Sequence, residues 1–568
     1  MSSVRKEAES DTRVDRTSLR TCGEHIPYML ADMGVDTVFG IPGVHSLELY
    51  RGLRAAGINH VSARHEQGAG FMADGYARAS GRPGVALLIS GPGVTNASTA
   101  IGQAYSDSIP VLVLSAALAR QDLGMNRGAL HEIVDQRAVT QPITGLSVLA
   151  HTADQVAAHL ITALGRLHAA RPRPVHVSLP MDVLAETAFA RPTVPAPPSR
   201  PAADPDQIQR LAELLRAARR PVIIAGGGAV GAADELRELV ELTGALFVST
   251  IAGKGIVPES HGQSLGASMQ RAPVRRAIAE ADLVVAIGTE LFIEEPEGGQ
   301  DAIFDGPSGK IPLMGVKLPV TGHFARIDID VEVAIRDYSP DIAIVADAAL
   351  AARALCRALS NEGQRKDTAG VVERAQHIRE QVDAGLSPLE SMHDRLLKVL
   401  REALPAETLV YADMTQLAYT GCMRFEMDVS GGWHFPQGYG TLGYALPAAI
   451  GGKLAAPERP VAAIIGDGGL QYTLQDLGTA SELKLPIPFV LWDNDALGDI
   501  VDAMRSTGID PIACNPRNPD FSLLARSYGA EYSAPSTLDE LRASVAAALN
   551  QAGPSIIHLR QRDFEPRQ

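Results

Sequence analysis

The stretch that decides the fold is AIIGDGGLQYTLQDLGTASELKLPIPFVLWDNDALGDIVDAM, which runs from Ala463 to Met504. It opens with an apolar run, breaks at a Gly-Asp-Gly-Gly turn, continues in a helical pattern, and ends a second apolar run, residues 489–492, at Asp493-Asn494. This pattern predicts a strand, a helix and a second strand joined as a βαβ unit. Because both strands of a parallel pair end on the same side, we expect Asp467 and Asn494 at the edge where open α/β sheets bind ligands.

The residues at this edge have the chemistry of a metal and diphosphate anchor. Gly468 and Gly469 can bring backbone N–H groups close to a phosphate at the start of a helix. Asp467 and Asn494 offer hard oxygen ligands, which suit Mg2+ or Ca2+ and not Zn2+. An ordinary βαβ unit with a glycine turn is the alternative that this stretch alone leaves open.

The Gly-Asp-Gly turn, with Asn494 placed 27 positions after Asp467, resembles the cofactor motif of the thiamine diphosphate enzymes. Those enzymes usually end the motif in Asn-Asn, and this chain has Asp493-Asn494, which keeps the second Asn, their metal ligand. The resemblance implies thiamine diphosphate and Mg2+ as cofactors, with Asp467, Asn494 and Ala496 as the metal positions.

Composition and charge exclude several classes of protein. The chain has 568 residues, 46% hydrophobic and 21% charged, with a net charge of −15, so we expect no nucleic-acid partner. No apolar run reaches the roughly 18 residues of a membrane span, and the polar start, MSSVRKEAESDTRVDR, is not a signal peptide. The four cysteines fit no metal spacing or disulfide framework. We therefore expect a cytoplasmic protein with no membrane partner.

Apolar runs of strand length alternate with helical patterns along the chain, which predicts three doubly wound α/β domains with mostly parallel sheets. We place a disordered tail at residues 1–16, an N-terminal domain at 17–185, a Pro-rich linker at 186–203, a central domain at 204–356 and a C-terminal domain at 371–560. The strand candidates besides the opening stretch are residues 37–39, 85–89, 111–114, 175–179, 222–225, 246–249, 283–287, 325–329 and 409–411. We expect Thr17 or Ser18 to cap a helix that runs to Met33, and Glu294–Gly309 to form a long loop.

The segment HEQGAGFMADGYAR, residues 65–78, closely resembles the one that carries the catalytic Glu of the acetolactate synthase and pyruvate decarboxylase family. On its own, Glu66 is equally well explained as a negative charge favoured at a helix N-terminus. The resemblance implies that Glu66 hydrogen-bonds N1′ of the cofactor's aminopyrimidine, which promotes proton removal from the thiazolium C2. By the same resemblance this is the pyrimidine-binding domain, and the C-terminal domain binds the diphosphate.

Two further positions of the N-terminal domain match the family. The turn SGPGVTN, residues 90–96, resembles the family's turn near the aminopyrimidine, which places Asn96 there as support, although an ordinary tight turn explains it as well. His131 stands where relatives carry a His or Gln that faces the reacting carbon. A structural histidine is the alternative to a proton relay or substrate contact.

The C-terminal domain contains two more segments of this kind. Thr415 and Gln416 follow the strand at residues 409–411, where the family has its second diphosphate-contacting loop; an ordinary strand-end turn is the alternative. Residues 438–449, GYGTLGYALPAA, resemble the family segment whose bulky apolar side chain holds the cofactor in a bent shape. Leu442 fits that role, and Gly440 would hold the pyrimidine edge through its carbonyl. Leu442 could instead be a core residue.

The central domain contains a formal GxGxxG, Gly226–Gly231, after a strand. A dinucleotide site should show an acidic residue at the end of the next strand, but that strand ends Val248-Ser249-Thr250, so we interpret the glycines as structural. The acetolactate synthases bind FAD in this domain. The segment associated with their flavin is replaced here by residues 288–291, Gly-Thr-Glu-Leu, which makes FAD doubtful.

Asp495, Asp499 and Asp502 are spaced so that they would share one face of a helix. In the family this helix leaves the metal site and borders the substrate pocket, and we hypothesise that Asp499 and Asp502 meet a cationic substrate tail. A guanidinium would gain most, through bidentate pairing. Two alternatives stay open: Asp495 serves only the helix N-terminus, and Arg505 pairs with Asp502 at the surface.

The resemblance covers nearly the whole chain and implies a thiamine diphosphate- and Mg2+-dependent decarboxylase that converts a 2-oxo acid to an aldehyde. The acidic residues favour a cationic substrate such as 5-guanidino-2-oxopentanoate. An acetolactate synthase-like carboligase that joins two 2-oxo acids shares every motif, and a non-catalytic binding protein of the same fold is a third possibility. In relatives the Glu and the Gly-Asp-Gly turn come from different subunits, so we expect a homodimer or homotetramer.

Overall fold

The computed structural model describes residues 21–188, 192–291, 317–360 and 368–565, together with the backbone of Ile303–Gly306 and Gly309–Pro312. The chain divides into two compact units: the first holds residues up to 198, except 75–81 and 169–171, and the second holds those two segments and the rest. The predicted tail, with Thr17 and Ser18, lies outside the described residues. The predicted domain boundaries stay predictions.

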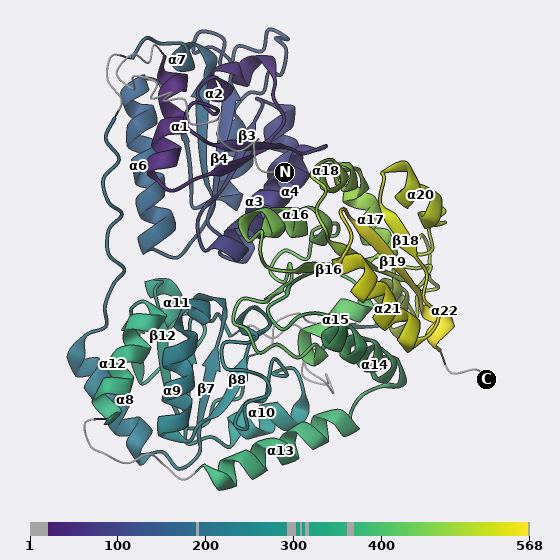
Figure 1. The fold of residues 1–568 in the computed structure, drawn as a ribbon. Coiled ribbons are helices and arrows are strands. Elements are labelled where there is room, and N and C mark those ends of the chain that lie inside the picture. The colour runs from purple at the N-terminus through teal and green to yellow at the C-terminus, as the bar shows by residue number, and fades with distance from the viewer. Residues whose placement is uncertain are drawn as a thin grey trace, which may run out of the picture. The chain divides into compact units, whose positions relative to one another are not determined.

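The first unit is built on a six-stranded sheet in the order β2-β1-β3-β4-β6-β5 (Figure 1), in which every pairing is parallel. Its strands are β1 (Thr37–Gly40), β2 (Asn59–Ser62), β3 (Gly84–Leu88), β4 (Val111–Ala117), β5 (Leu146–Leu149) and β6 (Val175–Pro180). Its helices are α1 (Cys22–Asp32), α2 (Leu47–Arg51), the first part of α3 (Glu66–Ser80), α4 (Pro92–Ser106), α5 (Gln136–Thr140), α6 (Ala153–Ala169) and α7 (Met181–Leu184). The central strands are buried over their whole length, as expected for a parallel sheet covered on both faces.

The first described helix begins later than we predicted. Thr21 is the N-cap of α1 and forms a capping box with Glu24, so the helix begins at Cys22. Its end agrees with the prediction, because Gly34 has a φ of +82° and the chain leaves the helix there.

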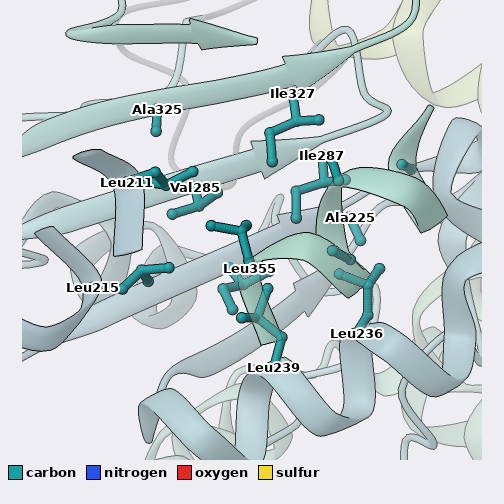
Figure 2. Packing of buried hydrophobic residues seen from close by; sticks show 14 of the residues in the cluster. Leu211, Leu215, Ala225, Leu236, Leu239, Val285, Ile287, Ala325, Ile327 and Leu355 are labelled. Atoms are coloured by element: carbon teal, nitrogen blue, oxygen red, sulfur yellow. The ribbon is translucent and has the colours of Figure 1, made fainter. Parts of the chain in front are cut away.

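The second unit contains a five-stranded parallel sheet in the order β13-β12-β9-β7-β8. Its strands are β7 (Pro221–Ala225), β8 (Leu246–Ser249), β9 (Leu283–Ile287), β12 (His323–Asp328) and β13 (Ile342–Val345), and its helices are α8 (Pro205–Ala217), α9 (Ala233–Thr243), α10 (Ala272–Ala279), α11 (Val331–Ile335) and α12 (Ala348–Ser360). Figure 2 shows leucines of α8, α9 and α12 packed against aliphatic side chains of β7, β9 and β12 in one buried cluster. The segment predicted as a long loop, Glu294–Gly309, instead contains β10 (Ile303–Gly306), which pairs antiparallel with β11 (Gly309–Pro312).

A six-stranded parallel sheet in the order β15-β14-β16-β17-β19-β18 completes the second unit. Its strands are β14 (Leu409–Ala412), β15 (Trp433–His434), β16 (Val461–Gly466), β17 (Pro488–Asp493), β18 (Glu531–Ser533) and β19 (Ser555–Arg560). The helices of this region are α13 (Ala369–Ala384), α14 (Pro388–Ala403), α15 (Gln416–Arg424), α16 (Ala445–Ala455), α17 (Asp467–Thr473), α18 (Leu477–Glu482), α19 (Gly498–Ser506), α20 (Phe521–Ser527), α21 (Leu538–Leu549) and α22 (Gln561–Phe564).

The prediction of three α/β domains with mostly parallel sheets is therefore confirmed. Most of the sheet strands that the sequence analysis did not find lie at sheet edges: β2, β5, β13, β15 and β18. It also missed β19, which lies between β17 and β18. Edge strands such as β2 and β5 are only partly buried, so they lack the continuous apolar run that marks a central strand. Among the described helices, none is long and apolar enough to span a bilayer.

Candidate functional site

The βαβ unit of the opening stretch forms as predicted and brings Asp467 and Asn494 to one sheet edge. β16 and β17 pair in parallel with Gly466 opposite Trp492, so the residues that follow the two strands lie side by side. Asp467 is the first residue of α17, where Gly468 and Gly469 form the first turn, and its side chain is buried. Asn494 follows β17 directly. The N–H groups of a first helical turn have no intrahelical partner, which suits them to an anion such as a diphosphate.

A residue from a distant loop joins the two acidic groups of this edge. The side-chain amide of Asn518 donates to Asp467 (2.7 Å) and to Asp493 (3.0 Å). Burial raises the pKa of Asp467 to about 6, against the opposing effect of the Asn518 hydrogen bond. A divalent cation bound to Asp467 would favour its ionised form and so overcome this effect of burial.

Asp493, which stands where the family usually has its first Asn, is held by a buried histidine. His558 of β19 hydrogen-bonds the second carboxylate oxygen of Asp493 through Nε2 at 2.8 Å, and its Nδ1 contacts the hydroxyl of Tyr532 at 2.9 Å. Burial alone would raise the pKa of Asp493, but the bonds from His558 and from the N–H of Asp495 lower it below its ordinary value. Asp493 therefore carries a negative charge beside Asp467 that an Asn would not.

The orientation of Asn494 depends on a side chain of the neighbouring strand end. Its amide nitrogen donates to Gln416 Oε1 at 2.9 Å, while its Oδ1 accepts the N–H of Ala496 at 3.2 Å and keeps capacity for a further bond. The Gln416 amide nitrogen donates in turn to Asp499 Oδ1 at 3.0 Å. Gln416, predicted to donate to phosphate, thus connects the metal position Asn494 to the candidate substrate residue Asp499.

The other predicted cofactor contacts of the second unit lie around the same edge. Thr415 packs against Gly466, because a Cβ at that glycine would be 2.9 Å from its hydroxyl. Gly440 has a φ of +63°, a conformation that favours glycine. Leu442 is half-buried, so part of its side chain is accessible to a ligand, and its neighbours Thr441 and Gly443 are buried.

The three acidic residues do not share one helix face. Helix α19 begins at Gly498, and Asp495 lies before it with a φ of +54°, so the predicted face reduces to Asp499 and Asp502. Asp502 is exposed and lies 4.0 Å from Arg505, which matches the surface pairing that we left open. Asp499 is the acidic residue of α19 that contacts the metal-site network.

In the first unit, Glu66 and Asn96 are brought together across 30 residues of sequence. Glu66 begins α3, separated by three residues from the end of β2, and Asn96 lies in the second turn of α4, which follows β3. The Asn96 side-chain amide donates to Glu66 Oε2 at 2.9 Å. This bond holds one carboxylate oxygen, so Asn96 can set the orientation of Glu66 as well as contact a ligand itself.

His131 lies on a loop of the first unit in a left-handed conformation, with a φ of +60°. Its ring meets that of His45 edge to face, with the centroids 5.2 Å apart, and His45 in turn contacts the Ser90 hydroxyl at 3.1 Å. His131 Nδ1 is buried without a hydrogen-bond partner among the described residues. Ser90 and His131 also line a cavity of about 140 Å3, together with Gln136 and Ser178. A buried, unsatisfied ring nitrogen beside a cavity is typical of a site that receives a ligand.

The glycine turn of the central sheet uses its backbone groups internally. The N–H groups of Gly226 and Gly228 donate to the carbonyls of Ile287 and Gly288, and the N–H of Ala229 donates to Gly226. Beside this turn, Glu290 pairs with Arg171 and Arg336. The N–H groups of Gly226, Gly228 and Ala229 are therefore not available to a phosphate, which supports the interpretation of the glycines as structural.

The residues that sequence reasoning missed are Asn518, His558 and His45. Asn518 lies in a loop rich in Asn and Pro, and His558 lies between the apolar residues Ile557 and Leu559 of β19. Neither residue stands at a motif spacing, because it is the order of the strands in the sheet that brings both of them to Asp493. His45 could have been found, because it lies five residues after the end of β1, which was predicted as a strand.

The donor set fits a Mg2+–diphosphate pair. A carboxylate (Asp467), a side-chain amide (Asn494) and nearby main-chain groups are oxygen ligands suited to Mg2+, which usually completes its shell with phosphate oxygens and water. Among the described residues, no group of three or more His, Cys, Asp or Glu side chains could hold a metal alone. A cation at this edge would therefore be bound together with its diphosphate.

Comparison with known proteins agrees with this geometry. Residues 20–139, 208–355 and 413–559 match the family models of the N-terminal TPP binding domain, the central domain and the C-terminal TPP binding domain of thiamine pyrophosphate enzymes. The chain is 46% identical to the probable 2-ketoarginine decarboxylase AruI of Pseudomonas aeruginosa, with 95% of this chain and 94% of that protein covered. It is 30% identical to the acetolactate synthase isozyme 1 large subunit of Escherichia coli, over 95% and 94% of the two chains.

A solved structure shows the same fold. The X-ray structure of a "putative thiamin diphosphate-dependent enzyme" from Mycobacterium smegmatis superposes with a TM-score of 0.80 at 23% identity, over 95% of this chain and 99% of that one. The three family matches together cover most of the sequence, and they place the N- and C-terminal TPP binding domains on the sheets that carry Glu66 and Asp467. The chain belongs to the thiamine pyrophosphate (thiamine diphosphate) enzyme family.

Proposed function

We propose that this chain is a thiamine diphosphate- and Mg2+-dependent decarboxylase that converts 5-guanidino-2-oxopentanoate to CO2 and 4-guanidinobutanal. The observation that carries the proposal is the 46% identity, over 95% of the chain, to a probable 2-ketoarginine decarboxylase, the same compound under another name. The site residues agree with the assignment. Glu66 and Asp467 begin helices and Asn494 follows a strand, which supports the roles that we propose for them.

The cofactor would be held at its two ends by different parts of the chain. Asp467 and Asn494, with the main chain at Ala496, would bind Mg2+, and the N–H groups of Gly468 and Gly469 would bind the diphosphate. Thr415 would add a hydroxyl donor, and Gly440 and Leu442 would support the pyrimidine. The bound thiamine diphosphate supplies a nucleophilic carbon and accepts the electron pair that is left when the C–C bond breaks and CO2 departs.

The protein's own part in the chemistry is to position and move protons. Glu66, oriented by Asn96 at 2.9 Å, would hydrogen-bond N1′ of the aminopyrimidine and so promote proton transfer within the cofactor. His131 has an unsatisfied Nδ1 beside a cavity, so it can exchange a proton with the reacting group or contact the substrate carboxylate.

Asp499 is the residue that we assign to the substrate's guanidinium, with Asp502 as a second, more exposed candidate. Asp499 is two hydrogen bonds away from Asn494, through Gln416, so its carboxylate lies at the same edge as the metal. Asp502 pairs with Arg505 at the surface and is not part of that network.

The substrate assignment predicts a charge-specific effect. Asp499→Asn should raise KM for 5-guanidino-2-oxopentanoate by about ten- to hundredfold, the range of a lost charge-assisted hydrogen bond, and leave kcat/KM for uncharged 2-oxoisovalerate unchanged. Asp502→Asn tests the second candidate on the same helix, and we expect a smaller effect from it because Asp502 is exposed and paired with Arg505. Equal effects on charged and uncharged substrates would contradict the role of Asp499.

A second candidate is an acetolactate synthase-like carboligase, which the 30% identity to the E. coli synthase favours. Product identification separates the two: the protein is given thiamine diphosphate and Mg2+, with and without FAD, and each of pyruvate, 2-oxoisovalerate and 5-guanidino-2-oxopentanoate. An aldehyde supports the decarboxylase and an acetohydroxy acid the carboligase. No product from any substrate, with bound cofactor, would support a non-catalytic protein of this fold.

We also propose a homodimer or homotetramer in the cytoplasm. Large apolar side chains stay exposed on the segments of the first unit that carry His45 and His131, a surface that a second subunit would cover. These residues are Val44, Leu47, Met125, Leu130 and Val134. The four cysteines are buried thiols, which suits a reducing compartment. Light scattering of the purified protein tests the oligomeric state.

A further inference from the structure

One backbone position of the second unit, Gly443, is held from both sides by fully buried side chains. Its N–H lies 3.1 and 3.0 Å from the two carboxylate oxygens of Asp413, the residue that follows β14. Its carbonyl accepts the hydroxyl of Thr473, the last residue of α17, at 2.8 Å. Asp413 and Thr473 have no solvent-exposed surface. The turn at Gly443 is thus connected at once to the end of strand β14 and to the end of helix α17.

The packing around Gly443 leaves no room for a side chain at this position. Its φ is +81°, and a Cβ would lie 2.7 Å from the Cβ of Tyr472 and 3.1 Å from the Thr473 methyl group. Asp413 also packs under the diphosphate turn, because a Cβ on Gly469 would be 3.0 Å from its Oδ2. The turn therefore rests directly on α17, the helix that begins with Asp467.

Leu442 is half-buried and directly precedes Gly443. The hydrogen bonds of Gly443 with Asp413 and Thr473 therefore also restrict the position of Leu442. We propose that Asp413 and Thr473 are positioning residues that lock the turn 440–444 to helix α17, so that the support of the pyrimidine and the anchor of the diphosphate form one rigid body. The proposal rests on the proposed function only in that Leu442 contacts the cofactor. Neither residue needs to touch the cofactor for the lock to work.

The lock has a consequence that an ordinary packing role lacks. Loosening Gly443 should displace Leu442 and the pyrimidine end of the cofactor, while Asp467, Asn494 and the amides of the Gly-Asp-Gly turn keep their places. A misplacement of about 1 Å at a reacting group costs on the order of a hundredfold in rate. The effect should therefore fall on cofactor activation and not on cofactor affinity.

The test compares Thr473→Val, which keeps the side-chain volume and loses the hydroxyl, with Thr473→Ser, which restores it. Thr243→Val is the matched control: this threonine is also buried and donates to a backbone carbonyl, at 2.7 Å, in helix α9 of the central sheet. Three quantities are measured. They are amide hydrogen exchange of residues 440–445 without cofactor, C2 hydrogen exchange of bound thiamine diphosphate, and the Kd of thiamine diphosphate with Mg2+.

In Thr473→Val we expect exchange of residues 440–445 to be about tenfold faster, C2 exchange to be about ten- to hundredfold slower, and the Kd to change by less than about threefold. Thr473→Ser and Thr243→Val should behave as wild type. If the amides of residues 440–445 and the cofactor C2 both exchange at the wild-type rate in Thr473→Val, the proposal is overturned. A parallel loss of affinity for thiamine diphosphate and for inorganic pyrophosphate would also overturn it, because the diphosphate anchor would then be damaged.

If Thr473→Val does not fold, Asp413→Leu makes the same test from the other side. Leu has nearly the same shape but no acceptor for the Gly443 N–H, whereas an Asn would keep one oxygen within reach, and the same pattern of exchange rates is expected. Wild-type rates in a folded Asp413→Leu would refute the lock. None of these measurements uses a 2-oxo acid, so a wrong substrate assignment would leave their outcome unchanged.

Discussion

Gly498→Ala should weaken Mg2+ binding while leaving the free energy of unfolding nearly unchanged. Gly498 begins α19, and a Cβ there would lie 2.7 Å from the amide nitrogen of Asn494 and from the side-chain amide of Gln416. Ordinary contacts begin at about 3.4 Å, so both amides must retreat by roughly 0.7 Å or rotate away. The 2.9 Å bond between Asn494 and Gln416 would then break, and the metal position Asn494 would lose the partner that orients it.

The expected cost falls on the metal site. Loss of a residue that orients a metal ligand lowers metal affinity by about 10- to 100-fold, or about 1.4–2.7 kcal/mol. The free energy of unfolding should change little, since the displaced groups are ends of flexible side chains and Ala is a better helix former than Gly by about 0.5–1 kcal/mol.

Titration calorimetry with Mg2+ in the presence of thiamine diphosphate measures the affinity, and thermal unfolding without cofactor measures the stability. Gly370→Ala is the matched control, because Gly370 also lies in the first turn of a helix, α13, and a Cβ added there would have no atom within 4 Å. Wild-type Mg2+ affinity in Gly498→Ala, or an equal loss in Gly370→Ala, would show that the contact between Gln416 and Asn494 does not orient the metal ligand.

Two other changes probe single groups. Glu66→Gln should slow C2 hydrogen exchange of bound thiamine diphosphate by about 10²- to 10⁴-fold, with the cofactor still retained in equilibrium dialysis, and unchanged turnover would refute the role of Glu66. Burial raises the pKa of Asp413 to about 7. The folded state thus holds a proton that the unfolded chain, with an Asp pKa of about 3.9, releases. The stability of the cofactor-free protein should therefore lose up to about 1.4 kcal/mol per pH unit between about pH 4 and 7 through this group and level off above. Urea unfolding across this range should show that Asp413→Asn lacks this contribution, and an identical pH dependence in both proteins would contradict it.

Much of the candidate site could be predicted because its signals are local. Asp467 and Asn494 are the ends of two neighbouring strands in one βαβ unit, and parallel pairing puts such ends together whatever the rest of the chain does. Glu66 at a helix start needs only the few residues around it. Most central strands were found for a similar reason, since strands covered on both faces are continuous apolar runs. The exception is β19, whose apolar run is interrupted by His558.

Other features depend on contacts between distant parts of the chain. Helix α19 was expected to include Asp495, but Asn494 accepts the N–H of Ala496 and the chain turns through a positive φ at Asp495 before the helix begins. In the predicted long loop, the residue pattern did not indicate strand β10, which pairs antiparallel with β11. These are cases where side-chain to backbone bonds and pairing geometry outweigh spacing.

By itself, the sequence determined the fold class, the two strand ends that carry Asp467 and Asn494, and the family resemblance, because apolar periodicity and motif spacing act over a few tens of residues. Only the tertiary structure decided how these groups are held: Asn518 between Asp467 and Asp493, His558 behind Asp493, and Gly443 between Asp413 and Thr473. Those contacts span 25 to 65 residues and depend on strand order and register. Apolar periodicity shows where a strand lies, but it does not show which strand lies beside it unless the two belong to one βαβ unit.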